Sequence, residues 1–360
     1  MPVILITVRS SSSPSTCGNT KATPSASAEM SIIDQPELEA FPLFADLPDD
    51  IARSIFELAA DDKNVDWECA LVSKKVKQWV EPVLYKSIVI DSTAGMSGLC
   101  RTIQFHPSKD PHFFSLHVKR LSLSDTNWLP SCGQIIAILE ACQSVKSLEL
   151  LMNYDIVKED IQIGVHNAWH GIRPQILTLP MLLFNPTHRH FRLSPNRPSL
   201  FVNVTHLELF VNRTLGAGQW SWASLSSLEA LTHLCLSSWN IDMETADVAR
   251  NHLTIAAPFF PPSLVVCAVA IRYIELGWDI RQLVEKSDWT TDDRVVVAVA
   301  KDYYDAELKS YGKWVARATI WRWDPCSESY YDEWQGFWDR AERMVKERRE
   351  SARLIASKRA

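Results

Sequence analysis

The chain has 360 residues, a formal net charge of −6, and a composition that is 46% apolar and 22% charged. This composition predicts a globular protein of about two domains, and the acidic balance argues against a general nucleic-acid binder. No apolar run reaches the length that crosses a membrane. The eight cysteines include no C-x-x-C pair, which argues against a zinc ribbon or a disulfide framework and favours reduced thiols in the cytoplasm or the nucleus.

Residues 1–40 are expected to form a disordered tail. Residues 9–28 consist mainly of Ser, Thr, Pro and Ala and contain no acidic group, so they cannot bury enough apolar surface to offset the entropy of ordering. The apolar run at residues 3–8 is too short for the core of a signal peptide. A mitochondrial presequence is the alternative, although Arg9 and Lys21 are the only basic residues in the tail.

A helix is predicted to begin near residue 47. Pro48 is tolerated in a first turn, where its missing N–H would have no partner, and the two aspartates that follow favour the positive end of the helix dipole. Ile51, Ile55 and Leu58 then recur at spacings of four and three residues. One face of this helix is therefore apolar and needs something to cover it.

Two further short helices are predicted before residue 82. The first carries Trp67 and Leu71, and the second begins after Ser73 and should end where Pro82 removes a backbone donor. Three short helices in about 40 residues bury too little surface to be stable alone. They therefore require either the downstream domain or a bound partner.

The order of motifs in this stretch resembles an F-box. Leu-Pro at residues 47–48 opens it, Leu-Val-Ser-Lys occupies residues 71–74, Trp79 follows, and Pro-x-Leu-Tyr at residues 82–85 leads into an apolar strand. The resemblance covers residues 47–90 well, and fungal F-box-like proteins look similar over a longer stretch.

The resemblance implies that the chain binds a Skp-type adaptor and, through it, a cullin, while the following domain holds a protein substrate. The chain would then be a substrate-receptor subunit of a Skp–cullin-type ubiquitin ligase with no chemistry of its own. The residues implied to face the adaptor are Leu47, Pro48, Ile51, Ile55, Val72 and Trp79. The alternative is a non-ligase interaction scaffold, in which F-box-like helices only cap a repeat solenoid.

A faint repeat follows the helices. The pattern apolar-x-x-apolar-x-apolar recurs at intervals of 27 to 33 residues, and each alternation predicts a short strand with inward apolar side chains. The pattern occupies residues 85–90, 118–123, 145–150, 174–179, 204–209, 231–236, 264–269 and 294–299.

These intervals resemble those of leucine-rich repeats and predict an irregular solenoid with parallel strands in sequence order. The fold class is therefore α/β, with a short all-α unit ahead of the solenoid; the alternative is a compact α/β domain without repeat ancestry. Apolar residues between 135 and 139 predict a helix that packs behind the strands. The predicted domains are a disordered tail at 1–40, an F-box-like helical domain at 41–84, a leucine-rich-repeat-like domain at 85–325 and a C-terminal amphipathic helix at 326–360.

The sequence contains no recognisable catalytic machinery. A Gly-rich phosphate loop, a G-x-S-x-G elbow and an H-E-x-x-H motif are absent, so we expect neither an enzyme nor a cofactor. His166 and His170 could share a helix face and hold a metal with His188 and His190, although ordinary surface histidines explain them better.

The C-terminal segment predicts a helix with a basic end. An apolar stripe at helical spacing runs from Trp334 to Val345, and it is expected to cap the end of the solenoid. Residues 340–360 contain eight Arg or Lys and three Glu. We interpret this surplus as a solvated helix end rather than a nucleic-acid site.

The predicted substrate face is the concave side of the strands. If the strands stack in register, the residues between the inward side chains form a ladder of Ser122, Glu149, Thr178, Glu208, Cys235 and Ala268. Arg120, His206 and His233 lie two residues earlier on the same side, and Phe210 adds an exposed aromatic. The candidate substrate-binding residues are therefore Arg120, Glu149, His206, Glu208, Phe210 and His233. The alternative is a solvated face that binds nothing.

Overall fold

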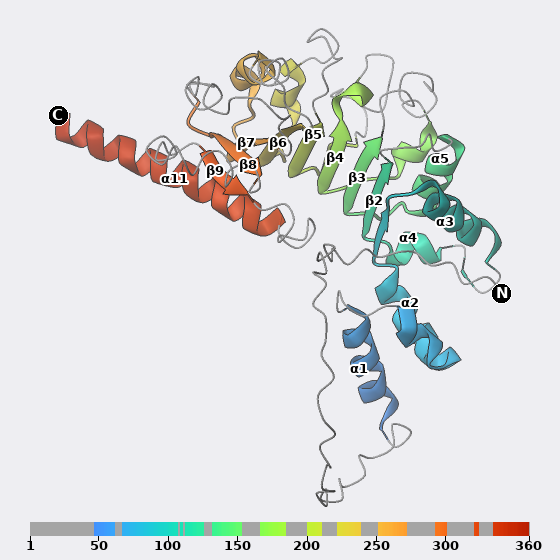
Figure 1. The fold of residues 1–360 in the computed structure, drawn as a ribbon. Helices are drawn as coiled ribbons and strands as arrows, with labels where there is room; N and C mark the ends of the chain where they lie inside the picture. The colour runs from blue at the N-terminus through green and yellow to red at the C-terminus, as the bar shows by residue number, and fades with distance from the viewer. Residues whose placement is uncertain are drawn as a thin grey trace, which may run out of the picture. The chain divides into compact units, whose positions relative to one another are not determined.

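The chain divides into two compact units, one spanning Thr7–Lys86 and a larger one that includes Ser87–Ala360. The structure is a computed structural model, drawn in Figure 1. The predicted tail at 1–40 lies outside the residues that it describes. The described residues are 47–61, 67–106, 109–110, 112–125, 132–152, 166–184, 200–210, 222–238, 251–271, 292–300, 320–323 and 334–359.

The smaller unit is helical where the structure describes it. α1 (Asp49–Asp61) is followed by the 3-10 helix η2 (Trp67–Leu71) and by α2 (Lys74–Leu84). Ser73 caps α2, because its side chain accepts a hydrogen bond from the Val76 N–H at 3.1 Å. The expected order of three short helices is confirmed, with the middle one wound more tightly than an α-helix.

The prediction that Pro82 ends the third helix is wrong. α2 continues to Leu84, and the Tyr85 N–H donates to the Glu81 carbonyl at 3.0 Å. A proline this close to the end of a helix removes a single backbone bond and leaves the remaining turn intact. Packing of Val83 and Leu84 against the core of the unit then holds the last turn.

Within its described residues the larger unit contains a nine-stranded parallel sheet with its strands in sequence order (Figure 1). All eight pairings between neighbours are parallel, so the predicted order of eight parallel strands is confirmed and the last strand is an addition. The strands are β1 (Ser87–Ile90), β2 (Arg120–Asp125), β3 (Ser147–Met152), β4 (Ile176–Pro180), β5 (His206–Phe210), β6 (His233–Ser238), β7 (Val266–Ile271), β8 (Val295–Ala300) and β9 (Ile320–Trp323).

One face of the sheet carries the leucines of the repeated pattern. Leu121 of β2 pairs in register with Leu148 of β3, and both side chains are almost fully buried. α3 (Thr93–Phe105) and α5 (Cys132–Ala141) pack against each other, and the Ile138 side chain of α5 is completely buried. Apolar burial at about 25 cal/mol per Å² makes such a core the main source of stability.

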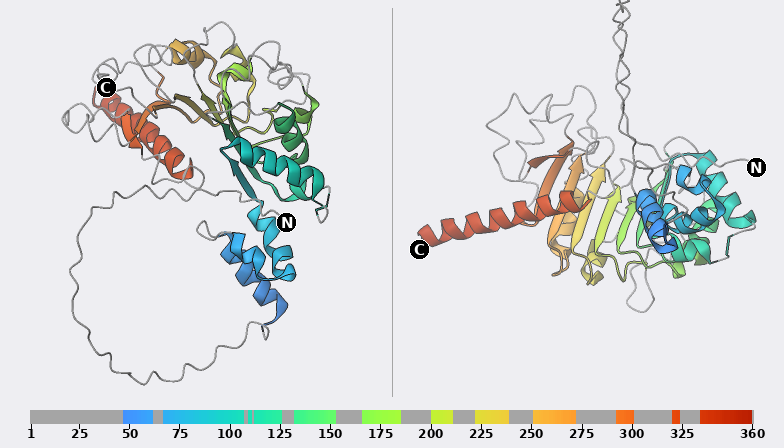
Figure 2. Two further views of the ribbon diagram at one scale, coloured as in Figure 1. Left: turned by 45° about the vertical axis from the view of Figure 1, so that its right-hand side comes forward. Right: turned by 90° about the horizontal axis from the view of Figure 1, so that it is seen from below.

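The opposite face is covered at β6 to β8 by α11 (Trp334–Arg359), whose C-terminal end runs on beyond the strands (Figure 2). The helix contributes Phe337, Trp338, Ala341 and Val345 to a buried cluster with Cys235, Val266, Ala268, Ala270, Val296 and Ala298. The predicted C-terminal helix is confirmed, but it packs on one face of β6 to β8 instead of capping the end of the solenoid as expected. The short side chains of these strands form a shallow apolar face, and two aromatic rings fill it.

The predicted ladder exists, but it is not exposed. Its six members pair successively in register from β2 to β7, as the alternation of the strands required. All six side chains are nevertheless buried: Ser122, Glu149, Thr178, Glu208, Cys235 and Ala268. The expectation of an open concave face is therefore wrong at these positions.

Candidate functional site

α1 presents its larger apolar side chains to solvent. Ile51, Ile55 and Leu58 follow one another along one face and are 47%, 45% and 76% exposed. The buried residues of the helix are only Ala52 and Ala60. Surface helices normally turn their large apolar residues inward, so this arrangement is typical of a face that a partner covers.

Two more apolar side chains are exposed at the junction of η2 and α2. Leu71 is 74% exposed and Val72 is 61% exposed, immediately before the Ser73 cap. Ser73 has an extended backbone and caps α2, so Leu71 and Val72 lie directly before the break between the two helices. The unit has five exposed large apolar side chains among its described residues. We call them the apolar surface: Ile51, Ile55, Leu58, Leu71 and Val72.

The core behind this surface is small. Ala60, Ala70, Val76 and Val80 form it, and partly buried side chains complete it: Phe56, Cys69, Trp79, Val83 and Leu84. Four short side chains supply little hydrophobic stabilisation, since a fully buried valine contributes about 1.5–3 kcal/mol. The unit therefore gains from any partner that covers its exposed residues.

Two ion pairs connect the ends of α1 to α2 and the residues that follow it. Lys75 Nζ lies 2.5 Å from Asp49 Oδ2, and Lys86 Nζ lies 3.2 Å from Asp61 Oδ1. All four side chains are more than half exposed. Exposed pairs contribute about 0–1 kcal/mol each, so they orient the two segments more than they stabilise them.

Tyr85, the C-cap residue of α2, carries a neutral phenol. Its ring meets the ring of Trp67 edge-on, with centroids 5.1 Å apart. Burial, and then the Glu81 carboxylate, raise the pKa of Tyr85 to about 12. The hydroxyl therefore stays protonated at any physiological pH.

A histidine pair joins α11 to the sheet in the larger unit. The rings of His206 and His233 stack with centroids 4.1 Å apart and an interplanar angle of 5°, and Trp338 meets both rings edge-on. His233 Nε2 lies 2.8 Å from Glu342 Oε1. Burial and the neighbouring His233 lower the pKa of His206 to about 4, and burial lowers the pKa of His233. Both rings are therefore largely uncharged at neutral pH.

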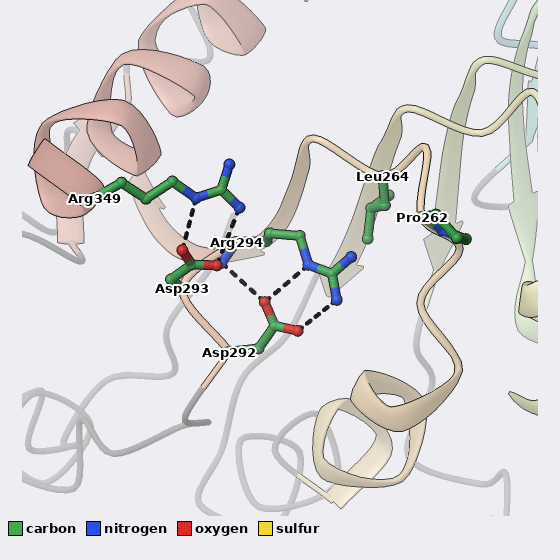
Figure 3. Close-up of a pocket in the computed structure, with 6 residues that line it drawn as sticks. All are labelled: Pro262, Leu264, Asp292, Asp293, Arg294 and Arg349. Carbon is green, nitrogen blue, oxygen red and sulfur yellow. Dashed lines mark hydrogen bonds and ion pairs between the residues drawn. The ribbon is translucent and has the colours of Figure 1, made fainter. Parts of the chain in front are cut away.

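One bidentate ion pair anchors α11 a second time, beside the start of β8, and a second one lies within the segment that leads into β8 (Figure 3). Arg349 Nε donates to Asp293 Oδ2 at 2.6 Å, and Arg294 donates to Asp292 at 2.9 and 2.7 Å. The hydrogen bond from Arg349 lowers the pKa of Asp293. The six residues in Figure 3 line an open cavity of about 440 Å³. Its two guanidinium groups and two carboxylates neutralise one another, so the cavity offers no net charge to a ligand.

A comparison with family models identifies part of this chain. Residues 44–128 match the model of the COS11 F-box domain. The chain carries an F-box domain. The match includes the helical unit described above and continues through β1, α3, α4 (Phe113–His117) and β2. No curated protein and no solved structure matches the chain.

F-box domains generally bind Skp-type adaptors. The residues predicted to face an adaptor can therefore be compared with the exposed residues of this domain. Within this F-box domain Ile51, Ile55 and Val72 are exposed, and so is Pro48. Trp79 differs, because it is half-buried against the small core, with Lys75 Nζ 5.3 Å from its ring centroid. Four of the six predicted residues are therefore exposed, and the other two, Leu47 and Trp79, are only partly exposed.

The most exposed apolar residues of the F-box domain were not in the predicted set. Leu58 and Leu71 exceed the others in exposure, whereas the F-box resemblance implies no adaptor contact for either residue. The signal was available for Leu58, since it continues the spacing of Ile51 and Ile55. The exposure of Leu71 depends on how η2 turns into α2, which no spacing indicates.

The residues predicted to bind substrate are mostly inaccessible. Glu149, Glu208, Phe210 and His233 are buried, with exposed fractions of 6%, 3%, 7% and 7%, and the expectation that Phe210 is exposed is wrong. His206 and Arg120 are partly exposed at the start of their strands. The predicted set therefore lies together on one face in register, but most of it faces the interior.

The described residues show no group of three or more His, Cys, Asp or Glu that could hold a metal. His166 instead caps the 3-10 helix η3 (Asn167–His170), since its Nδ1 accepts a hydrogen bond from the Ala168 N–H at 3.2 Å. His188 and His190 lie outside the described residues. None of the described helices combines the length and the apolar character needed to span a membrane.

Proposed function

We propose that the chain is a substrate-receptor subunit of a Skp–cullin-type ubiquitin ligase, with the F-box domain binding the adaptor and the sheet unit binding a protein substrate. The observation that carries this proposal is the apolar surface, because five large aliphatic side chains are exposed within a domain of a family that generally binds Skp-type adaptors. Exposed apolar clusters of this kind mark interaction sites on soluble proteins. Covering them supplies binding energy and completes a unit with a small core.

The sheet unit fits a leucine-rich-repeat-like solenoid within this proposal. Its strands follow in sequence order, pair in parallel and bury the repeated apolar positions. Repeats of this kind stack side by side and present extended surfaces to protein partners. A receptor needs such a surface, and no reaction chemistry, to hold its substrate.

The proposed site of action is the cytoplasm or the nucleus. The cysteines Cys100, Cys142, Cys235 and Cys267 are free and buried. Burial raises the pKa of Cys142 to about 12, so this thiol stays protonated and behaves as an apolar side chain. Such thiols suit a reducing compartment.

The proposal is tested by adaptor capture with a matched pair of variants. Leu58→Asp combined with Leu71→Asp places two charges on the apolar surface, whereas Ser54→Asp combined with Gln78→Asp places two charges on exposed polar positions of the same unit. We expect the wild type and the polar control to co-purify with a Skp-type adaptor and the leucine variant to lose it.

Three results would contradict the proposal. The wild type failing to capture adaptor would favour a stand-alone scaffold. Undiminished capture by the leucine variant would show that the apolar surface is not the contact. Equal loss in the polar control would indicate a general effect of charge, and melting curves of all three proteins establish that each is folded.

A further inference from the structure

Two lysines lie side by side where β2 and β3 begin. Lys119 precedes β2 and Lys146 precedes β3, and the N–H groups of Lys146 and Ser147 donate to the Lys119 carbonyl at 2.8 and 3.0 Å. Neighbouring strands are about 4.8 Å apart, so the two side chains start from adjacent positions. The two lysines therefore place two positive charges next to each other at this edge of the sheet.

Further cations lie near this pair. Arg120 is the first residue of β2. Lys109 Nζ lies 4.0 Å from the centroid of the Phe113 ring, and that ring lies 4.8 Å from the ring of His117. Burial and the positive charges of Lys119 and Lys109 lower the pKa of His117. Asp110, a carboxylate close by in sequence, accepts a hydrogen bond at 2.6 Å from the backbone N–H two residues further on.

Several cations elsewhere in the described residues have carboxylate partners, and these two lysines do not. Lys75 pairs with Asp49, and Arg349 pairs with Asp293. Across the described parts of the chain, neither lysine of the β2–β3 edge lies within ion-pair distance of a carboxylate.

An exposed apolar side chain adjoins the cations. Leu116 of α4 is 60% exposed and is covalently next to His117. Lys146 is exposed and Lys119 is partly exposed, so both ammonium groups can reach a partner. Lys109 Nζ and the Nε and Nη2 atoms of Arg120 are buried, so neither residue is counted in this surface. We call the surface the basic edge: Leu116, Lys119 and Lys146.

We propose that the basic edge binds an acidic peptide segment of the substrate, an inference that rests on the proposed receptor function. Carboxylates of the segment pair with the ammonium groups of Lys119 and Lys146. An apolar residue of the segment covers Leu116. Electrostatic complementarity of this kind speeds association and selects acidic partners over basic ones. This surface replaces the ladder as the substrate contact, because most ladder side chains are buried.

The experiment measures binding of a fluorescein-labelled peptide of Glu and Leu residues to the full-length chain by fluorescence anisotropy. A peptide with Gln in place of each Glu is the neutral comparison. Lys119→Glu combined with Lys146→Glu should weaken binding of the acidic peptide by at least about tenfold. Lys346→Glu combined with Arg353→Glu changes the net charge equally on exposed positions of α11 and should leave affinity within about twofold. Binding should also weaken as salt rises from about 0.05 to about 0.2 M.

If the glutamate variant does not fold, Lys119→Gln with Lys146→Gln replaces it and should show a smaller loss in the same direction. The proposal is overturned if the wild type does not bind the acidic peptide, if the neutral peptide binds equally, or if both variant pairs lose affinity alike. Tighter binding of a single-stranded oligonucleotide of equal charge would also overturn it, by assigning the surface to nucleic acid. Adaptor capture is measured on the same preparations. Failure of the wild type to capture the adaptor would contradict the receptor function, whereas peptide binding reports on the basic edge alone.

Discussion

Leu58 and Leu71 of the F-box helices are about three-quarters exposed, whereas Leu207 and Leu234 of the sheet are completely buried. The two regions therefore use the same residue type in opposite ways. The sheet turns its leucines into a core that many strands share, while the helical unit encloses mainly alanine and valine and keeps its larger aliphatic residues outside. The difference teaches that the sheet unit covers its large apolar residues with its own chain, whereas the helical unit leaves them for the adaptor of the proposed function.

The largest expected effect comes from placing a charge in the leucine core. Leu207→Asp puts a carboxylate at a position with no solvent exposure, so it should cost several kcal/mol and unfold the sheet unit. Urea unfolding followed by circular dichroism measures the loss. Gln175→Asp, at an exposed position just before β4, is the control and should change stability by less than about 0.5 kcal/mol. Glu208→Lys on the next strand is unsuitable as a control, because Glu208 is buried.

A large effect is also expected at the contact between α11 and the sheet. Trp338→Ala removes a ring that is 2% exposed and contacts both histidines, which should cost about 3–5 kcal/mol. Denaturant titration gives the stability change, and limited proteolysis shows whether α11 is released. Arg343→Ala on the exposed side of the same helix should leave both measurements unchanged. Equal proteolysis of wild type and Trp338→Ala would mean that other contacts hold the helix.

A moderate effect is expected from pH. The folded pKa of His206 is about 4, below the ordinary histidine value near 6.5, and the pKa of His233 is lowered in the same direction. The unfolded chain therefore binds protons between about pH 6.5 and 4 that the folded chain does not, so stability falls as pH drops through this window. Melting temperatures measured from pH 7.5 to 4.5 should decline by several degrees. His206→Gln with His233→Gln should flatten that part of the decline, and an unchanged slope would place its origin elsewhere.

The smallest effect on stability is expected at the apolar surface. Leu58→Asp alters a side chain that is already 76% exposed, so the free energy of unfolding should change by no more than about 0.5 kcal/mol. Calorimetry of the full chain measures it. A destabilisation of several kcal/mol would show that this leucine is part of a core and would remove the contrast between the two regions.

Much of the fold was predictable because it depends on short-range patterns. Alternating apolar residues located eight strands, and the same alternation predicted that Glu149, Thr178 and Glu208 would stand in register on neighbouring strands. Ser73 predicted the start of α2 through a hydrogen bond that spans three residues. Ile320–Trp323 was missed as a strand because four residues without a repeated leucine give no comparable signal.

The sequence by itself determined where the strands and short helices lie, which side chains alternate along them, and that residues 47–90 resemble an F-box. The tertiary structure decided which faces are covered. α11 comes from the C-terminal end of the chain to bury the β6–β8 part of the ladder face, and η2 turns Leu71 outward. Periodicity describes one element at a time, whereas burial depends on which distant element packs against it, and this is why a correct ladder was paired with a wrong expectation of exposure.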